Sequence, residues 1–507
     1  MRQGCWHRIW GVFMYRKADK NQIMLEDFSL PFGGKLRAEN RWVKLAAVTP
    51  WDKIEEQYLK TMKEDQGRAA LSARIAFGAI SVRKSEGLSD EGTVSYIQEN
   101  PYVQYYLGLH EFRAEPLFDA SMMVHFRKRF PVEFVAKVNE YICTGKWPEE
   151  IRNVDRNDDR HDGGTGGGSA EEIKEENVSE NKGTLVMDAT VAPADIKYPT
   201  DIDLLNQCRE HLEKAIDLLW ASVSHDGHKL PYNAKKARKA FLNISKSKKW
   251  TQKKLHVGIG QQLKYIGQAS ERLKQMQQQV ENWKSILPGW LKDRLTVIPL
   301  VYAQQKQMYE NNTRRCDDRI VSLQQSHVRP IVRGKRPEPT EFGQKLHLSV
   351  VNGYVFFEQT SWSNFNEGND LPASVEDYRR KYGTYPTAVL ADKIYQTREN
   401  RRYCKDRNIR LSGPTLGRPK RGKAPEEDEQ QMYRDACDRN IIEAKNGTAK
   451  RRYGLDLILS KLDETSKTDA ALSILMMNSW KRVRRVLFYL LRQWLFPSAS
   501  LPQILTR

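Results

Sequence analysis

The sequence predicts an α/β protein in which a mixed sheet carries a large all-helical insertion and follows an all-α N-terminal domain. Three observations lead to this prediction. Apolar runs with a two-residue period, typical of strands, recur between residues 184 and 411. Three- and four-residue apolar spacing, typical of amphipathic helices, dominates over 51–151 and again over 202–325. A glycine-rich acidic stretch at 152–183 separates the first helical part from the first strand.

Composition favours a soluble protein with a polyanionic partner. The 507 residues carry a formal net charge of +19, and a surplus of that size is typical of nucleic-acid-binding proteins. The six cysteines form no C-x-x-C pair, which indicates a reducing cytoplasm and no zinc site. Two apolar runs near the C-terminus are both shorter than the ~20 residues of a membrane span. We therefore expect a cytoplasmic, nucleoid-associated protein that does not engage a membrane.

The N-terminal part is predicted to read DNA. Residues 1–50 are expected to form an irregular arm and residues 51–151 a helical domain. Ser89 is a plausible N-cap for a helix over 93–99. A second helix, up to Phe130, places Arg127, Lys128 and Arg129 beside apolar residues, as in a helix-turn-helix-like DNA reader. The alternative is a helical subdomain with a solvated basic edge.

The next stretch, 152–183, combines clustered glycines with acidic residues. Low hydrophobicity of this kind cannot repay the entropy of ordering, so we expect a flexible linker. The glycine run is a poor phosphate loop, because no Lys-Ser/Thr pair follows it.

A strand over 184–191 carries Asp188 and leads into the helical insertion 202–325. Between Pro231 and Lys254 this insertion has nine basic residues and no acid. Such a block repels itself unless phosphates neutralise it, so we predict DNA contact, against the alternative of a solvated helix face. The candidate contacts are Lys235, Lys236, Arg238, Lys239, Lys248 and Lys249.

After the insertion the period returns to two. Asn352-Gly353 between two apolar runs predicts a β-hairpin. We then expect a helix at about 372–382, a strand over 387–391 that ends at Asp392, a further helix and a short strand at 408–411. Two basic loops, which supply Arg333 and Lys335 and then Arg418 and Lys420, are suited to a phosphate backbone. A helix with Glu443 and a largely helical tail over 461–507 complete the chain.

Three carboxylates have the settings of a metal site. The predicted order is a strand with Asp188, a hairpin, a strand with Asp392 and a helix with Glu443. This is the order of elements in an RNase H-like sheet, and we expect such a domain over residues 184–460. An Asp-Asp-Glu set suits two Mg²⁺ ions, which Mn²⁺ can replace, and predicts phosphoryl transfer on DNA. On the same helix face, Arg439 and Lys450 flank Glu443 at i−4 and i+7. The alternative for Glu443 is a surface residue paired with Lys445 or Arg439.

These residues lie within a chain that resembles the DDE transposases of bacterial insertion sequences, specifically the InsH-type group, from about residue 50 to about 480. The resemblance rests on short motifs in order along both predicted domains. They are 76–78 (AFG), 88–91 (LSDE), 99–102 (ENPY), 126–129 (FRKR), 188–190 (DAT), 198–201 (YPTD), 328–335 (VRPIVRGK), 353–356 (GYVF), 391–395 (ADKIY), 412–414 (SGP) and 417–419 (GRP).

The resemblance implies a catalytic triad of Asp188, Asp392 and Glu443, with Asp188 bridging two metal ions and the other two acids each holding one. It implies cleavage at the terminal inverted repeats of a mobile element and joining of the freed 3′-hydroxyl to target DNA, with no small-molecule cofactor. Arg439 and Lys450 match the family's Tyr-x2-Arg-x3-Glu-x6-Lys pattern, but Ala436 stands where the family has tyrosine. Pairing of two double-stranded ends makes a homodimer the expected working state.

Three other functions are consistent with parts of the pattern. An RNase H-like nuclease would cleave without strand transfer, a regulator would bind DNA with inert acids, and a helical scaffold would bind DNA without a steep dependence on salt.

Overall fold

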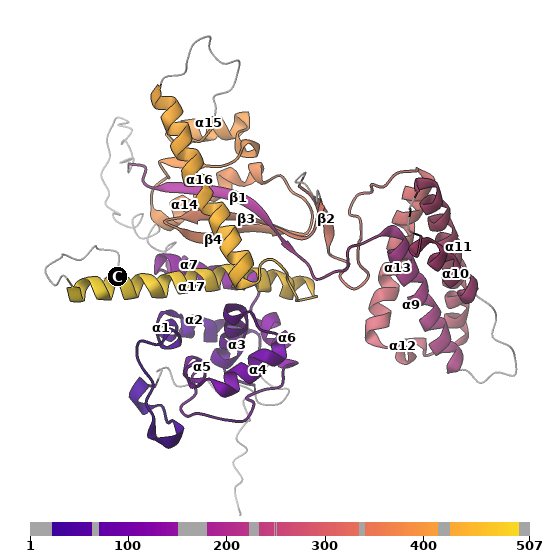
Figure 1. The fold of residues 1–507 in the computed structure, drawn as a ribbon, viewed down its shortest axis with the longest axis horizontal. Coiled ribbons are helices and arrows are strands. Elements are labelled where there is room, and N and C mark those ends of the chain that lie inside the picture. Colours follow the sequence, from indigo (N-terminus) through magenta and orange to yellow (C-terminus); the bar gives the residue numbers. More distant parts are fainter. Residues whose placement is uncertain are drawn as a thin grey trace, which may run out of the picture.

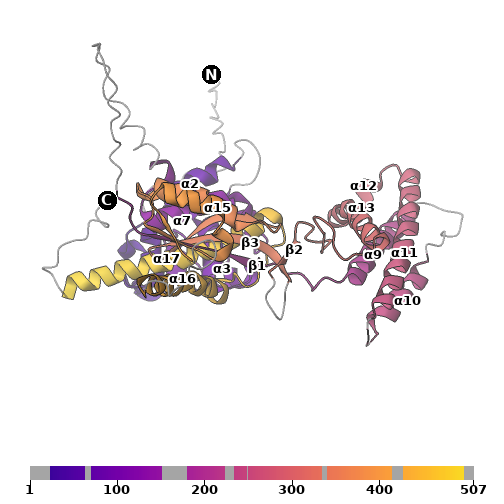
Figure 2. The ribbon, with the colours of Figure 1, turned by 90° about the horizontal axis from the view of Figure 1, so that it is seen from above.

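The structure, a computed structural model, describes residues 23–62, 70–150, 180–222, 233–247, 249, 251–333, 340–413 and 426–495. Figure 1 shows a main body that contains the sheet and the N-terminal helices, and a helical lobe set apart from it beyond β2. The view from above in Figure 2 shows the same separation. The predicted linker over 152–183 lies outside the described residues except for 180–183.

The N-terminal part is helical, as predicted, but it begins before residue 51. Helix α1 (Arg41–Val48) buries Trp42 and Leu45, so these residues belong to the domain core and not to an irregular arm. Two short 3-10 helices, η1 (Leu25–Asp27) and η2 (Pro31–Gly33), precede α1. The helices that follow are α2 (Trp51–Lys60), α3 (Ala73–Glu86), α4 (Asp90–Glu99), α5 (Pro101–Tyr106), α6 (Met122–Arg129) and α7 (Val132–Thr144). Ser89 caps α4, as predicted, by accepting a hydrogen bond from the amide of Gly92 at 3.0 Å.

A six-stranded mixed sheet forms the centre of the main body. Its strands are β1 (Thr184–Pro193), β2 (Arg329–Val332), β3 (Thr340–Val351), β4 (Tyr354–Ser361), β5 (Ala388–Leu390) and β6 (Arg410–Leu411). The order is β2-β3-β1-β5-β6, with β4 also paired to β3. Strand β3 is antiparallel to β1, β2 and β4, whereas β1, β5 and β6 are parallel to one another.

The predicted hairpin at Asn352-Gly353 is confirmed. Val351 pairs with Tyr354, and both turn residues have positive φ, 52° for Asn352 and 74° for Gly353. Two consecutive left-handed residues define the turn type whose twist matches antiparallel strands, and Asn-Gly is its preferred sequence.

The two faces of the sheet pack against different helices. Alternate residues of a strand point to opposite faces. Val186 belongs to a core with Ile442 of α16 (Glu426–Tyr453), whereas Leu185 and Met187 belong to a core with Val375 of α14 (Leu371–Tyr382). The second face also carries η3 (Glu367–Asp370), η4 (Lys393–Tyr395) and α15 (Arg398–Asp406). The helix with Glu443 therefore lies over the face to which the even-numbered residues of β1 point.

The helical insertion forms a lobe with its own core. Its helices are α9 (Asp201–Ala221), α10 (Ala234–Ser245), α11 (Gln252–Gln279), α12 (Trp283–Ile286) and α13 (Gly289–Glu310). Leu212, Ile266 and Ile298 are buried in this core, which is distinct from the cores of the main body. A small cluster that includes Ala194, Val328 and Trp362 lies where the lobe joins the sheet.

The C-terminal residues form a central helix and not a tail. Helix α17 (Asp463–Leu495) buries nearly every residue from Asp469 to Ser479. It packs against α1, α3, α6 and α7 of the N-terminal part and against α16 and β4. Figure 1 shows it running between the N-terminal helices and the sheet. Within the described residues, no helix is both long enough and apolar enough to cross a membrane.

Candidate active site

The register of β1 and β5 brings Asp188 and Asp392 to the same edge of the sheet. Val186 of β1 pairs with Leu390 of the parallel strand β5. Asp188 and Asp392 each lie two residues beyond that pair, Asp392 in the segment directly after the end of β5 at Leu390, and adjacent strands are ~4.8 Å apart. Leu390, like Val186, belongs to the core beneath α16. The alternation directs Asp188 to the face that α16 covers, whereas Asp392 lies beyond β5 and is the N-cap of η4.

Helix α16 brings Glu443 to the same edge. Ile442, Asn446 and Ala449 of α16 are buried, and this stripe fixes the rotation of the helix on the sheet. Glu443 projects from the flank of the helix and its side chain is 60% exposed. Arg439 Nη2 lies 4.0 Å from Glu443 Oε1, one turn earlier. The pairing with Arg439 that the sequence offered as an alternative is therefore present.

The charges around Asp188 define the electrostatics of the site. Burial raises the pKa of Asp188, and the nearby carboxylate of Glu443 raises it further. A hydrogen bond from the backbone amide of Ala189 and the cations of Arg333 and Arg439 oppose this rise. Arg333, at the end of β2, also donates to the carbonyl of Ala189 at 3.4 Å. Asp188 is thus surrounded by Glu443 and two arginines from separate elements.

Asp392 has a different setting. It is exposed, and its side chain accepts a hydrogen bond of 2.7 Å from the amide of Lys393, which starts η4. Beneath it the ring of Tyr395 is fully buried, and the carboxylates of Asp188 and Asp392 both help to raise the pKa of its phenol, after the larger effects of burial and Glu367. The buried hydroxyl of Tyr395 has no hydrogen-bond partner in the described part of the chain. This tyrosine was noticed in the sequence only as part of the motif 391–395.

The donor chemistry of the three carboxylates fits a divalent metal ion, because Mg²⁺ and Mn²⁺ prefer hard oxygen ligands. The orphaned hydroxyl of Tyr395 beside two of them is a further polar group without a protein partner. Over the described residues, however, no three Asp, Glu, His or Cys side chains are close enough together to be recognised as a metal-binding group. Asp188, Asp392 and Glu443 therefore do not form such a close group in the described part of the chain.

An ion pair missed by the sequence reasoning fixes the first half of α16. Arg410 of β6 pairs with Asp435 of α16, and Gln431 donates to the same carboxylate at 2.9 Å. The contact ties the edge strand of the sheet to the helix two turns before Glu443. Its partners are 25 residues apart, and no local pattern in the sequence could have paired them.

The predicted DNA-binding residues divide into several groups. Lys128 of α6 is exposed, as are Lys249 and the α10 residues Lys235, Lys236, Arg238 and Lys239. Lys450 is half-buried, and it follows Glu443 by seven residues on the same flank of α16. The predictions for Lys248, Lys335, Arg418 and Lys420 fall outside the described residues.

The prediction that Arg127 contacts DNA is wrong. Its side chain is 6% exposed and donates to both oxygens of Asp90, at 2.9 and 2.8 Å. Arg129 is half-buried and donates to the carbonyl oxygen of Thr61 at 2.9 Å. The basic run of α6 therefore presents Lys128 to solvent, while Arg127 stabilises the fold and is not available to DNA.

Comparisons with known proteins find two matching family models. The family model described as "Transposase DDE domain" matches residues 389–479, which include Asp392 and Glu443. A model described as "Transposase domain" matches residues 31–129, so the matched segment, like the helical domain, begins before residue 51. No solved structure matches the chain.

A curated relative, an uncharacterised protein named ORF8 in the nfe locus of Rhizobium meliloti, is 37% identical over 87 residues. The match covers 17% of this chain and 42% of the relative, so the chain spans less than half of that protein. The two family models, one over residues 31–129 and one over residues 389–479, indicate an insertion-sequence DDE transposase.

Proposed function

We propose that this transposase binds the terminal inverted repeats of its element, cleaves DNA at the ends and joins the 3′-hydroxyl to target DNA. The observation that carries the proposal is the register of the parallel strands β1 and β5, which pairs Val186 with Leu390 two residues before Asp188 and Asp392, together with the packing of α16 on β1. Phosphoryl transfer needs charge stabilisation at the attacking and leaving oxygens and little covalent chemistry from the protein. A trio of carboxylates from two strands and a helix is suited to hold the ions that provide it.

Asp188, Asp392 and Glu443 are the proposed metal ligands, with Asp188 shared between two ions. Two divalent ions, Mg²⁺ or in its place Mn²⁺, would supply the positive charge that activates the attacking oxygen and stabilises the leaving one. The raised pKa of Asp188 has burial as its main cause, and a bound cation would reverse that effect by favouring the ionised carboxylate. The ionised carboxylate of Asp188 thus destabilises the fold without a cation and would be stabilised by one.

Arg333, Arg439 and Lys450 are the proposed phosphate contacts beside this edge. Arg333 and Arg439 both act electrostatically on Asp188, so their cations lie close to the place that a scissile phosphate would occupy. Arginine can present two parallel donors to phosphate, which holds its orientation as well as its charge. In the family pattern Ala436 replaces a tyrosine, so any contact through that ring would be missing here.

The wider DNA contacts would come from the helical lobe and the N-terminal domain. Four exposed cations of α10 lie within residues 235–239, and that helix contains no acidic residue. This arrangement favours phosphate contact. Lys128 is the remaining candidate on α6. Synapsis of two ends would make a homodimer on double-stranded DNA the working state, with no membrane or small-molecule cofactor involved.

The strand order supports an RNase H-like fold for the catalytic domain. A central parallel pair β1–β5, an edge strand β6 on one side and the antiparallel strands β3 and β4 on the other form the order expected for that fold. The helical lobe enters between β1 and β2, where the sequence placed the insertion. We also propose that the chain belongs to the InsH-type group of transposases, because of the motifs in its sequence.

The test is an assay of the full chain on a supercoiled plasmid that carries the gene with its flanking DNA. We expect Mg²⁺-dependent nicks at the element ends and, with pre-cut ends, products joined to a target plasmid. Glu443→Gln should lower both by about 100-fold or more. The matched control is Glu429→Gln, because Glu429 is also an exposed glutamate of α16.

The outcomes separate the competing functions. Nicks without joined products would favour a nuclease that does not transfer strands. Unchanged Mg²⁺-dependent nicking in both Glu443→Gln and Asp188→Asn, or DNA binding without any cleavage, would contradict catalysis by these carboxylates and favour a DNA-binding regulator.

A further inference from the structure

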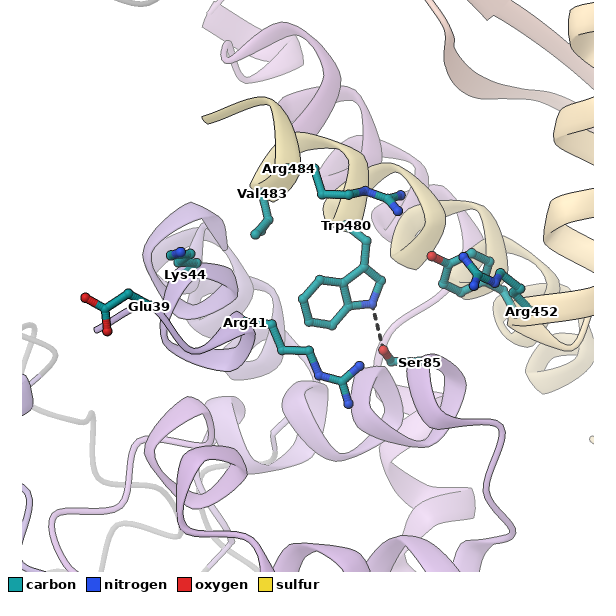
Figure 3. Close-up of a pocket in the computed structure, with 9 residues that line it drawn as sticks. Glu39, Arg41, Lys44, Ser85, Arg452, Trp480, Val483 and Arg484 are labelled. Atoms are coloured by element: carbon teal, nitrogen blue, oxygen red, sulfur yellow. Dashed lines mark hydrogen bonds between the residues drawn. The ribbon is translucent and has the colours of Figure 1, made fainter. Parts of the chain in front are cut away.

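A pocket of about 460 Å³ lies where the N-terminal helix α1, the end of α16 and helix α17 meet. Figure 3 shows Arg41 and Lys44 from α1, Arg452 from α16 and Arg484 from α17 around the ring of Trp480. We call this the cationic pocket. The two cations of α1 are more than 400 residues away in sequence from Arg452 and Arg484, so only the folded chain assembles all four.

The cationic pocket has little negative charge to balance these cations. Arg41 pairs with Glu86 at 2.8 Å. Lys44, Arg452 and Arg484 form no ion pair with any residue that the structure describes. Glu39 is the one acid that lines the pocket among the described residues, and in Figure 3 its carboxylate points away from the arginines. The surplus is therefore local to this pocket as well as a property of the whole chain.

The cationic surface continues beyond the pocket. Burial lowers the pKa of Lys445, and the nearby cation of Arg484 lowers it further. Burial also lowers the pKa of Lys481 to about 8, with repulsion from Lys445 and Arg485 adding to the effect. Five cations on α16 and α17 thus crowd one another. They are Lys445, Arg452, Lys481, Arg484 and Arg485. Crowding of like charges costs stability unless a polyanion neutralises it.

The walls of the pocket are held in place. The indole nitrogen of Trp480 donates to Ser85 of α3 at 2.7 Å, as Figure 3 shows. The guanidinium of Arg41 lies 5.5 Å from the Trp480 ring, and the ring of Trp42 packs edge-on against it at 5.4 Å. Buried Tyr453 lines the pocket beside Arg452. Aromatic rings fixed in this way help to orient Arg41 before any ligand arrives.

Helix geometry separates this pocket from the proposed catalytic edge. Ile442 and Ala449 face the sheet. Lys445 and Arg452, seven residues apart, project from one flank of α16, whereas Glu443 and Lys450, also seven residues apart, project from the other. The helix is ~10–12 Å across and the major groove of DNA is ~12 Å wide. The two strands of one duplex are therefore far enough apart to contact both flanks.

We propose that the cationic pocket binds phosphodiester groups of double-stranded DNA at a second contact surface, on the flank of α16 opposite Glu443. The choice of DNA as the ligand rests on the proposed function. The strand that reaches Lys450 and the strand that reaches Arg452 would then lie on either side of the same helix. In this arrangement α17 and the N-terminal helix α1 contribute directly to holding DNA at the catalytic domain.

The test measures the affinity of the full chain for a short fluorescent duplex over a range of NaCl concentrations, without divalent ions. The test variant is Arg452→Gln/Arg484→Gln, and the matched control is Arg314→Gln/Arg315→Gln, two exposed arginines of the α13–β2 connection. We expect the test variant to bind about tenfold more weakly at physiological salt. Its slope of log K against log [NaCl] should be shallower by about 1.8, at ~0.9 per lost phosphate contact. The control should retain the wild-type slope.

A second variant keeps the charge. Arg452→Lys/Arg484→Lys should retain most of the salt slope, which separates the loss of phosphate contact from a loss of folding; thermal melts of all variants check the fold. An unchanged slope in the folded glutamine variant would overturn the proposal. So would an acidic polypeptide that binds the wild type through these arginines while the duplex does not.

Because no divalent ion is present, the measurement does not depend on cleavage. If the plasmid assay shows no nicking or joining but the salt dependence of DNA binding is shallower in the glutamine variant, the proposal for the pocket is supported and the proposed catalysis is contradicted. If nicking and joining occur but the slope is unchanged, the catalysis stands and the pocket fails.

Discussion

Asp469 of α17 forms an ion pair with Arg83 of α3, with 3.0 Å between Oδ1 and Nη1, and both side chains are almost completely buried. Lys84 lies 3.2 Å from the same oxygen, and Arg83 also contacts Asp90, the partner of Arg127. The buried charges thus join the C-terminal helix to three N-terminal helices. One hydrophobic core also includes residues of the N-terminal helices, the sheet and α17, although the two ends of the main body match separate family models.

Replacing Asp469 should strongly destabilise the protein. Asp469→Asn would leave Arg83 and Lys84 buried without a carboxylate, and loss of one partner from a buried ion pair typically costs ~3–5 kcal/mol. We expect a lower denaturation midpoint in urea. Asp438→Asn, at an exposed position of α16, is the control and should leave the midpoint unchanged. Equal midpoints for the two variants would show that this ion pair does not stabilise the assembly of α3 with α17.

Arg127 and Lys128 should respond in opposite ways, although they are adjacent. Arg127→Gln removes the two hydrogen bonds to Asp90 and should lower the free energy of unfolding by about 2–3 kcal/mol. Lys128→Gln changes an exposed side chain and should leave stability within about 0.5 kcal/mol, while weakening DNA binding if α6 faces DNA. Urea melts and duplex titrations of both variants check this. Equal stability losses would contradict the burial of Arg127.

The buried His347 predicts a pH dependence of stability. Burial lowers the pKa of His347 to about 4, although Asp370 lies 3.3 Å away. The folded pKa is below the ordinary value near 6.5, so the unfolded chain takes up the proton first and stability falls as the pH drops from about 6.5 to 4. His347→Asn should lose ~1–3 kcal/mol of this dependence. Melting curves across that pH range measure it, and an identical pH dependence in both proteins would rule out His347 as its source.

The ionised carboxylate of Asp188 should destabilise the fold when no divalent ion is present. Its raised pKa means that the folded protein disfavours the ionised carboxylate, so this acid destabilises the fold increasingly as the pH rises above its unfolded pKa near 4. Without divalent ions, Asp188→Asn should therefore raise the melting temperature at pH 7 by roughly 1–2 °C, and by less at pH 4. A lower melting temperature at pH 7 would mean that this carboxylate stabilises the fold without a metal.

Local patterns were sufficient to predict several strands of the sheet. The alternation in 184–191, the Asn-Gly turn at 352–353 and the strand before Asp392 are each encoded within a few residues, and β1, the hairpin and β5 appear where expected. The level at which Asp188 and Asp392 meet follows from strand register, which tertiary packing sets and which the order of elements implied.

Long-range partners explain what the sequence did not predict. The apolar residues 470–477 resemble any amphipathic segment, and only contacts with α3, α7 and β4 make α17 a central helix. Arg127 looked like part of a solvent-facing basic run because its partner Asp90 is 37 residues away. Trp42 is fully buried, yet the residues before 51 gave no clear period from which that could be inferred. Burial of charged residues depends on such pairings, which spacing does not reveal.

The most direct test of the three-carboxylate site is to replace Mg²⁺ with Fe²⁺ in the protein–DNA complex and map the peptide bonds that ascorbate and peroxide then cleave. A shared metal site predicts cuts clustered around residues 188, 392 and 443, all three abolished together by Asp188→Asn and retained in Glu429→Gln. Cuts at only one of these segments, or a pattern that Asp188→Asn leaves unchanged, would contradict the shared site and with it the proposed mechanism.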